Sequence, residues 1–255
     1  MQIHIGTSGY QYAHWGNGVF YPRGTRDRLA YALERMDAIE INSSFYRIPP
    51  PATVARWNAA LPAGAELVLK APQSVSHRRR LKLHSDAAVR QGIDLLNYFI
   101  EGAIQIHVEN RGPILLQVPG NMAIDLGRLE PVLQLFAERG LKVAFEVRHP
   151  SWAVTPTYRL LEQYNAAMVV SDWPGFHAPL VVTADFIYLR RHGPQALYAS
   201  SYDDRALCED LLQLYKQHPA NAYVFFNNDI HGYAPHNAMR MIALMKRGIA
   251  RPALS

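Results

Sequence analysis

Short apolar runs alternate with longer amphipathic segments along the whole chain, and this alternation restricts the fold more than any other feature. The apolar runs, such as Ile3–Gly6 and Ala167–Ser171, suit strands that are buried on both faces. The segments between them repeat apolar side chains with the period of an α-helix, as Ile93, Leu96 and Ile100 do. Alternation of this kind is typical of a parallel sheet with helical connections.

Eight strands are predicted, and all but one precede a helical segment. The strands are expected at Ile3–Gly6, Ala38–Asn42, Glu66–Lys70, Ile114–Val118, Lys142–Val147, Ala167–Ser171, Phe186–Arg190 and Tyr223–Phe226. The helices are expected at Thr25–Met36, with Thr25 as N-cap, and at Thr53–Leu61, Asp86–Ala103, Leu129–Arg139, Pro156–Tyr164, Arg205–Gln217 and His236–Lys246. Trp173–Ala184 contains two prolines and a glycine, so the helix after the sixth strand is expected to be short or missing.

This order predicts one (β/α)8 barrel of the TIM type over residues 1–255. The length suits one such barrel as well as two ordinary domains. The alternative fold is an open doubly wound sheet, which normally carries a Gly-rich phosphate loop after its first strand. The segment Gly6–Gly9 lacks the GxGxxG spacing, and the chain contains no GxxxxGK[ST] motif. The barrel is therefore favoured.

Composition excludes several classes of protein. Hydrophobic residues make up 49% of the chain and charged residues 18%, which excludes an intrinsically disordered chain. Cys208 is the single cysteine, so an internal disulfide and a metal site built from cysteines are excluded. No run reaches the roughly 20 apolar residues of a membrane helix, and Met1–Tyr10 has no signal-peptide pattern. We therefore expect a cytoplasmic protein without a membrane partner.

Polar side chains occur where the predicted strands end, which is where barrel enzymes place their active sites. Alternate residues of a strand point to the same side, and the helix-facing side should be apolar. The polar set should therefore point into the mouth of the barrel. The expected catalytic residues are Glu40, Glu146, Asp172 and His149. The expected substrate-binding residues are Asn42, Lys70, Gln117, Arg148, Arg190, His192, Asn227 and Asn228. For His149 the alternative is a packing role near a helix N-cap.

Burying so many polar groups costs several kcal/mol for each unpaired ion. One interpretation is a polar pocket whose spare donors and acceptors serve a ligand. The alternative is a self-satisfied network in which Glu40 and Glu146 pair with Lys70, Arg148 and Arg190.

A basic run follows the third strand and contributes to the net charge of +5. It is either a solvated loop or a patch for nucleic acid or phosphate formed by His77, Arg78, Arg79 and Arg80. Aromatic residues in neighbouring loops either contact a bound sugar or base or pack against nearby residues of the protein. They are Tyr10, Tyr12, Trp15, Phe45 and Tyr46.

Several of these segments together resemble the YecE-like family, also called domain of unknown function 72. The matching segments are Ile5–Tyr10 with Trp15, Glu40–Tyr46, Lys70 with Ser76-His77, Gln117–Pro119, Glu146–His149 with Trp152, Tyr188–Arg190 with His192-Gly193, and Phe226–Asn228 with Asn237-Ala238. The resemblance covers nearly the whole chain. It implies a (β/α)8 barrel but no established reaction, and the family's kinship to sugar isomerases and metal-dependent nucleases is an analogy of fold.

Three functional hypotheses remain open. The first is a hydrolase or isomerase that acts on a polar sugar-like or phosphorylated small molecule, with Glu40, Glu146 and Asp172 as acid and base. The second is a metal-dependent phosphodiester hydrolase or a nucleic-acid binder. The third is a non-catalytic ligand-binding barrel. A divalent metal on Glu40, Glu146, Asp172 and His149 or His192 fits either of the first two, although no compact ligand motif is present.

Overall fold

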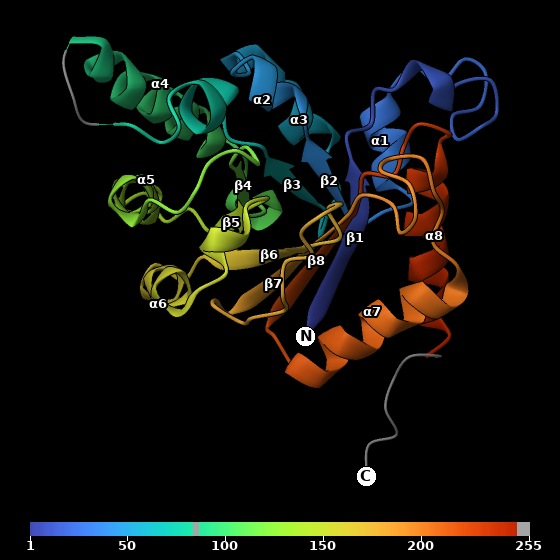
Figure 1. Ribbon diagram of the computed structural model, residues 1–255. Coiled ribbons are helices and arrows are strands. Elements are labelled where there is room, and N and C mark those ends of the chain that lie inside the picture. Colours follow the sequence, from blue (N-terminus) through green and yellow to red (C-terminus); the bar gives the residue numbers. More distant parts are fainter. Residues whose placement is uncertain (84–86, 249–255) are drawn as a thin grey trace.

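Eight parallel strands form a barrel wall with helices packed outside it (Figure 1). The computed structural model describes residues 1–83 and 87–248. The strands are β1 (Gln2–Ser8), β2 (Ala38–Ile41), β3 (Glu66–Leu69), β4 (Ile114–Gln117), β5 (Val143–Glu146), β6 (Ala167–Ser171), β7 (Phe186–Arg191) and β8 (Asn221–Phe226). Their order in the sheet is β3-β2-β1-β8-β7-β6-β5-β4. The predicted (β/α)8 barrel is confirmed.

The barrel closes between β3 and β4 through a small number of contacts. Leu67 bridges to Arg111 and Lys70 bridges to Leu115 in parallel register. The amide of Ala71 donates to the carbonyl of Leu115 at 2.9 Å, and the amide of Gly112 donates to the carbonyl of Leu67 at 3.0 Å. This seam brings Lys70 and Gln117 to the same edge of the mouth.

The predicted helices occur in the expected order, with shifts of a few residues at their ends, while the short α2 was not predicted and the expected helix start at Asp86 lies outside the described residues. They are α1 (Arg28–Leu33), α2 (Ser43–Tyr46), α3 (Pro51–Ala60), α4 (Ala87–Ala103), α5 (Leu126–Ala137), α6 (Thr155–Gln163), α7 (Asp204–Gln217) and α8 (Tyr233–Lys246). Short 3₁₀ turns span Ala13–Trp15, Val108–Asn110 and Pro150–Trp152, and a π-helical turn spans Ser74–Arg78. Among the described residues, no helix is long and apolar enough to cross a membrane.

Two local predictions have clear outcomes. The expected N-cap at Thr25 is wrong, because α1 begins at Arg28 and the carboxylate of Asp27 accepts a hydrogen bond from the amide of Ala30. The hydroxyl of Thr25 instead donates to the carbonyl of Pro22. The missing helix after the sixth strand is confirmed, since the fully described segment 172–185 contains only turns and extended chain.

The core has two parts. One lies between the strands and the helices, and the other fills the barrel. Inside the barrel, large side chains of β7 and β8 face small ones of β2, β5 and β6; the large ones are Phe186, Tyr188, Tyr223 and Phe225, and the small ones are Ala38, Ala144 and Ala167. Gly6 is required at the β1–β2 contact, because a Cβ there would lie 1.7 Å from the carbonyl oxygen of Ala38. This aromatic layer fills the barrel directly below the polar residues of the mouth, and the hydroxyl of Tyr188 contacts Glu40.

Candidate active site

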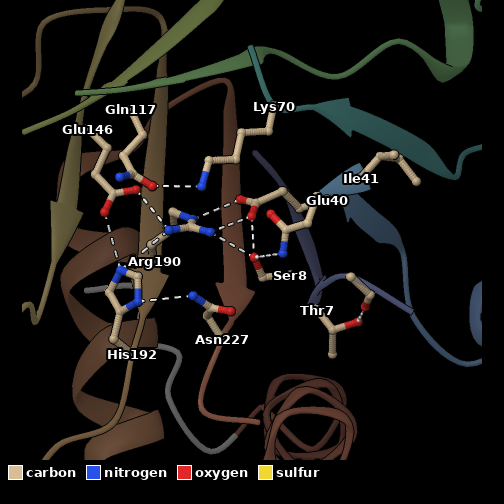
Figure 2. Close-up of polar contacts among 12 residues, drawn as sticks. Thr7, Ser8, Glu40, Ile41, Lys70, Gln117, Glu146, Arg190, His192 and Asn227 are labelled. Carbon is tan, nitrogen blue, oxygen red and sulfur yellow. Dashed lines mark hydrogen bonds and ion pairs between the residues drawn. The ribbon is translucent and has the colours of Figure 1, made fainter. Parts of the chain in front are cut away.

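Arg190 is the centre of the polar network at the carboxyl ends of the strands (Figure 2). Its side chain comes from β7 and is 1% exposed. Nε donates to Glu40 Oε2 at 2.9 Å, and Nη2 donates to Glu40 Oε1 at 2.5 Å and to Ser8 Oγ at 2.7 Å. Nη1 donates to Glu146 Oε2 at 2.8 Å. One guanidinium therefore joins carboxylates from β2 and β5.

Each carboxylate oxygen of Glu40 and Glu146 has at least one hydrogen-bond or ion-pair partner in the protein. Glu40 also accepts from the hydroxyl of Tyr188 at 2.7 Å and from the hydroxyl of Ser8. Burial alone would raise the pKa of Glu40, but the adjacent Arg190 guanidinium more than offsets it, and the pKa lies below its usual range. The pKa of Glu146 lies well below its usual range for the same reason, with Arg148 contributing. Both carboxylates are ionised at neutral pH.

A cavity of about 830 Å³ opens above this network. Six of the eight predicted substrate-binding residues line it: Asn42, Lys70, Gln117, Arg148, Arg190 and Asn227. Glu40 and Glu146 are fully buried beneath it, at 0% exposure. The predicted substrate-binding residues that face the cavity are therefore amides and cations, while Glu40 and Glu146 lie in the layer below.

Lys70 differs from Arg190 in how its charge is held. Nζ donates to Gln117 Oε1 at 2.7 Å and lies 4.4 Å from the centre of the Phe45 ring. Within the described chain it forms no ion pair with a carboxylate. Burial lowers the pKa of Lys70 to about 7, and Arg190 adds to this effect while the two glutamates oppose it. Near neutral pH a large fraction of this amine is uncharged.

Two further groups complete the side of the cavity near Lys70. The Gln117 amide nitrogen lies 3.4 Å from His77 Nε2, so the amide is fixed with its oxygen toward Lys70. Burial and the nearby Lys70 lower the pKa of His77 to about 4, so its ring is neutral. The Arg148 guanidinium lies 3.4 Å from the centre of the Trp173 ring, and its Nε lies 3.3 Å from Glu146 Oε1. Arg148 therefore lines the cavity with its guanidinium held between Trp173 and Glu146.

His192 and Asp172 do not line the cavity but contact residues of the polar network. His192 Nε2 lies 3.3 Å from Glu146 Oε1, and its Nδ1 lies 3.1 Å from Asn227 Nδ2. The Asp172 carboxylate accepts from the amide of His192 at 2.6 Å and from the hydroxyl of Tyr202. Both Asp172 oxygens are thus occupied by the protein.

The two remaining predicted residues lie outside the cavity lining. His149 Nδ1 accepts from the amide of Ser151 at 3.2 Å and caps the turn Pro150–Trp152, in agreement with the packing alternative. Asn228 is buried and donates to the carbonyl of Ser200 and to Asn237 Oδ1, each at 2.8 Å.

The basic run does not form one surface. His77 lines the large cavity, whereas Arg78 lines a separate groove beside it. Arg79 packs its side chain near Gly92, and Arg80 is exposed. The patch predicted for nucleic acid or phosphate is therefore divided between two hollows and the outer surface.

Sequence reasoning did not select His14 and Asp229, which both line the cavity. Trp15 Nε1 donates to Asp229 Oδ1 at 2.5 Å. His14 Nε2 lies 2.8 Å from the backbone carbonyl oxygen of Asp229 and 3.1 Å from its Oδ2, so Nε2 must carry the proton. Burial raises the pKa of Asp229 to about 6. The available signal was the position of Asp229 directly after Asn227 and Asn228 at a strand end.

The residues predicted to hold a metal ion are engaged with other groups. In residues 1–83 and 87–248, no three or more His, Cys, Asp or Glu side chains are grouped so that they could hold a metal ion together. Glu40 and Glu146 bind Arg190, and Asp172 binds the amide of His192.

Comparisons with known proteins place the chain in a structural context. The family model described as "Protein of unknown function DUF72" matches residues 4–254. A DUF72 family protein from Thermotoga maritima MSB8 is 26% identical with a TM-score of 0.78, covering 96% of this chain and 100% of its own. A DUF72 family protein from Enterococcus faecalis V583 is 19% identical with a TM-score of 0.78, covering 96% of both chains.

A more distant structural likeness links the fold to an epimerase. The 3-keto-D-glucoside 4-epimerase YcjR from E. coli is 12% identical with a TM-score of 0.57, covering 97% of this chain and 99% of its own. At this identity the likeness concerns the fold alone. No curated protein matches the chain.

Proposed function

Since the chain belongs to the DUF72 family, whose members are described as proteins of unknown function, we propose an activity from the cavity itself. The protein is an isomerase-type enzyme that moves a proton at a carbon beside the carbonyl group of a polar, sugar-like small molecule. Lys70 is the proton acceptor. The non-catalytic ligand-binding barrel is the alternative that the experiment below separates from it.

The state of Lys70 is the observation that supports this proposal most. An amine can accept a proton only when it is neutral, and a pKa of about 7 makes a large fraction of Lys70 neutral at physiological pH. An ordinary surface lysine is almost fully charged there. The neutral Gln117 oxygen holds Nζ in place without the carboxylate that would restore its charge.

The groups around Lys70 suit the remaining needs of such a reaction. Removing a proton beside a carbonyl places negative charge on the carbonyl oxygen, and the Arg148 guanidinium is positioned to bind it. Lys70 Nζ can return the proton from its own face, either to the same carbon or to the neighbouring carbon once the hydroxyl proton has moved between the two oxygens, so no other reactant is consumed. Asn42 Oδ1 is buried and has no hydrogen-bond partner among the described residues, which leaves it available to accept from a substrate hydroxyl.

Glu40 and Glu146 receive a different role from the one that sequence reasoning gave them. Their pKa values lie below the usual range, so neither holds a proton to donate near neutral pH. They are fully buried and bound to Arg190. In this proposal they are positioning residues that fix the floor of the cavity. The fold likeness to a 3-keto-D-glucoside 4-epimerase is consistent with sugar chemistry, as an analogy only.

The test is deuterium exchange from solvent into substrate carbon, followed by ¹H NMR. The purified protein is incubated in D2O with a panel of aldoses, ketoses and their phosphates. We expect exchange at one carbon beside the carbonyl, and K70Q and K70R should each slow it by about 100-fold or more. K70R keeps the positive charge but cannot act as a base near neutral pH. Lys142→Ala, which alters a partly exposed lysine outside the cavity lining, is the matched control.

The contrary outcomes are distinct. Exchange at the wild-type rate in both K70Q and K70R would remove Lys70 from the chemistry. Sugar binding without exchange across the panel would favour the non-catalytic barrel. Exchange that a chelator abolishes and an added divalent metal restores would favour the metal-dependent alternative.

A further inference from the structure

A second hollow of about 430 Å³ lies directly beside the cavity that holds Lys70. We call it the side groove. It is formed by α2 with the residues after it, by the turn Ser74–Arg78, and by α4. Phe45, Tyr46 and Gln73 line both the side groove and the large cavity. One elongated small molecule can therefore reach both.

The side groove carries positive charge without a balancing carboxylate. Arg47 and Arg78 line it, and neither forms an ion pair with a described carboxylate. No Asp or Glu is among the described residues that line the groove. Among the described residues, some exposed arginines are paired, as Arg205 is with Glu209, and others such as Arg159 are not, so the distinguishing feature of the groove is that two guanidiniums share it. Two unpaired guanidiniums on one concave surface are suited to an anionic group.

Aromatic exposure is concentrated at the same groove. Tyr46 is 72% exposed and Tyr98 is 54% exposed, and they are the two aromatic residues among the large apolar side chains that the described chain leaves exposed. Both line the side groove. Such rings offer flat apolar faces to the carbon face of a sugar and hydroxyls to its oxygens. The Tyr46 ring contacts Phe45 edge to face, with 5.1 Å between the ring centres, and more than half of each tyrosine remains exposed to solvent.

We propose that the side groove binds the phosphate group of a phosphorylated, sugar-like substrate. Arg47 and Arg78 hold the phosphate, and the carbon chain passes Tyr46 and Phe45 to place its carbonyl end at Lys70. The proposal rests on the proposed function for the position of the carbonyl, and it adds the substrate class. The small groove volume and the presence of two unpaired cations favour a single phosphate, because a nucleic acid strand needs a longer row of them.

The test uses probes that bind but cannot react. Glucitol 6-phosphate carries a phosphate and no carbonyl, glucitol lacks both, and inorganic phosphate is the minimal anion. Binding of each is measured by isothermal titration calorimetry to wild-type protein, R47A, R78A and the double variant. We expect glucitol 6-phosphate to bind at least about tenfold more tightly than glucitol, and each arginine variant to lose most of that difference.

Two controls separate this effect from net charge and from catalysis. Arg159→Ala removes one positive charge from the exposed side of α6 and should leave binding unchanged. K70Q should change the binding of glucitol and of glucitol 6-phosphate by a similar factor, so that the affinity difference due to the phosphate persists. Thermal unfolding confirms that each variant is folded.

Several results would overturn the phosphate subsite. These are equal binding of glucitol and glucitol 6-phosphate, no binding of either phosphate probe at millimolar concentration, or full binding in the double arginine variant. A single-stranded oligonucleotide that binds more tightly than glucitol 6-phosphate, with steep salt dependence, would instead assign the groove to nucleic acid. Arginine-dependent phosphate binding without proton exchange on any sugar would retain the subsite and refute the proposed function.

Discussion

Lys70 Nζ donates a 2.7 Å hydrogen bond to Gln117 Oε1, so a neutral amide holds this amine where a carboxylate would be the usual partner. Below it, Arg190 binds both buried glutamates. These two cations therefore differ: two carboxylates stabilise the charge of Arg190, whereas burial destabilises the charge of Lys70.

Replacing Lys70 by Met should change how stability depends on pH. The pKa of Lys70 falls from 10.5 to about 7 in the folded protein, so between these values the unfolded chain binds a proton that the folded chain lacks. The unfolding free energy of the wild type should therefore rise relative to K70M as pH rises through this window, by up to about 1.4 kcal/mol per pH unit. Urea unfolding from about pH 7 to about pH 9.5 measures this, with Lys142→Met as control. Parallel curves for wild type and K70M would contradict the shifted pKa.

Arg190→Met should destabilise the barrel strongly. It leaves Glu40 and Glu146 buried without their shared cation, and such a loss typically costs about 3–5 kcal/mol. The triple variant with Glu40→Gln and Glu146→Gln should recover part of that loss, because the uncompensated charges are gone. Glu209→Gln, which breaks an exposed pair, should change stability by less than about 1 kcal/mol. Denaturant unfolding provides the values, and equal effects of R190M and E209Q would refute the buried network.

Gly6→Ala should prevent normal folding. The added Cβ would lie 1.7 Å from the carbonyl of Ala38, so β1 and β2 would have to separate. Gly127→Ala, in α5, meets only ordinary contacts and should be neutral or stabilising by up to about 1 kcal/mol. Soluble yield and thermal unfolding distinguish the two, and a normally stable G6A protein would show that the strand contact is looser than described.

Asp229→Asn should remove a pH dependence of the unfolding free energy that the wild type shows at acidic pH. Burial raises the pKa of Asp229 from 3.8 to about 6, so the folded protein keeps a proton that the unfolded chain loses between these values. The unfolding free energy of the wild type should therefore fall relative to D229N as pH rises from about 4 to about 6. Asp94→Asn, at an exposed position of α4, is the control. If D229N and the wild type keep a constant difference over this range, burial does not raise the pKa of Asp229 as described.

The barrel could be predicted because its signals are local. The alternation of apolar runs with helical periods is visible within windows of a few residues, and so is the break at Trp173–Ala184. The strand ends then indicated six of the residues that line the cavity, since inward and outward positions alternate. Helix starts were less certain, because Thr25 and Asp27 are both suitable N-caps and only the position of the first turn decides between them.

Pairings across the barrel could not be read from the sequence. One hypothesis paired Lys70 with the glutamates, whereas the closing seam places it against Gln117. His14 and Asp229 were missed because they meet across 215 residues of chain, and neither belongs to a motif. The divided basic run has the same cause: the π-helical turn directs His77 and Arg78 into different hollows, and no periodicity reveals this.

The position of Arg190 also governs how the chain can fold. Its carboxylate partners come from both halves of the barrel, since Glu40 lies on β2 and Glu146 on β5. A fragment holding only β1–β4 would bury Glu40 without Arg190, and a fragment holding only β5–β8 would leave Arg190 with Glu146 as its single carboxylate partner. Neither fragment should fold alone, and fluorescence and circular dichroism should report one coincident unfolding transition for the whole chain. A single guanidinium thus makes the two halves of the barrel one cooperative unit.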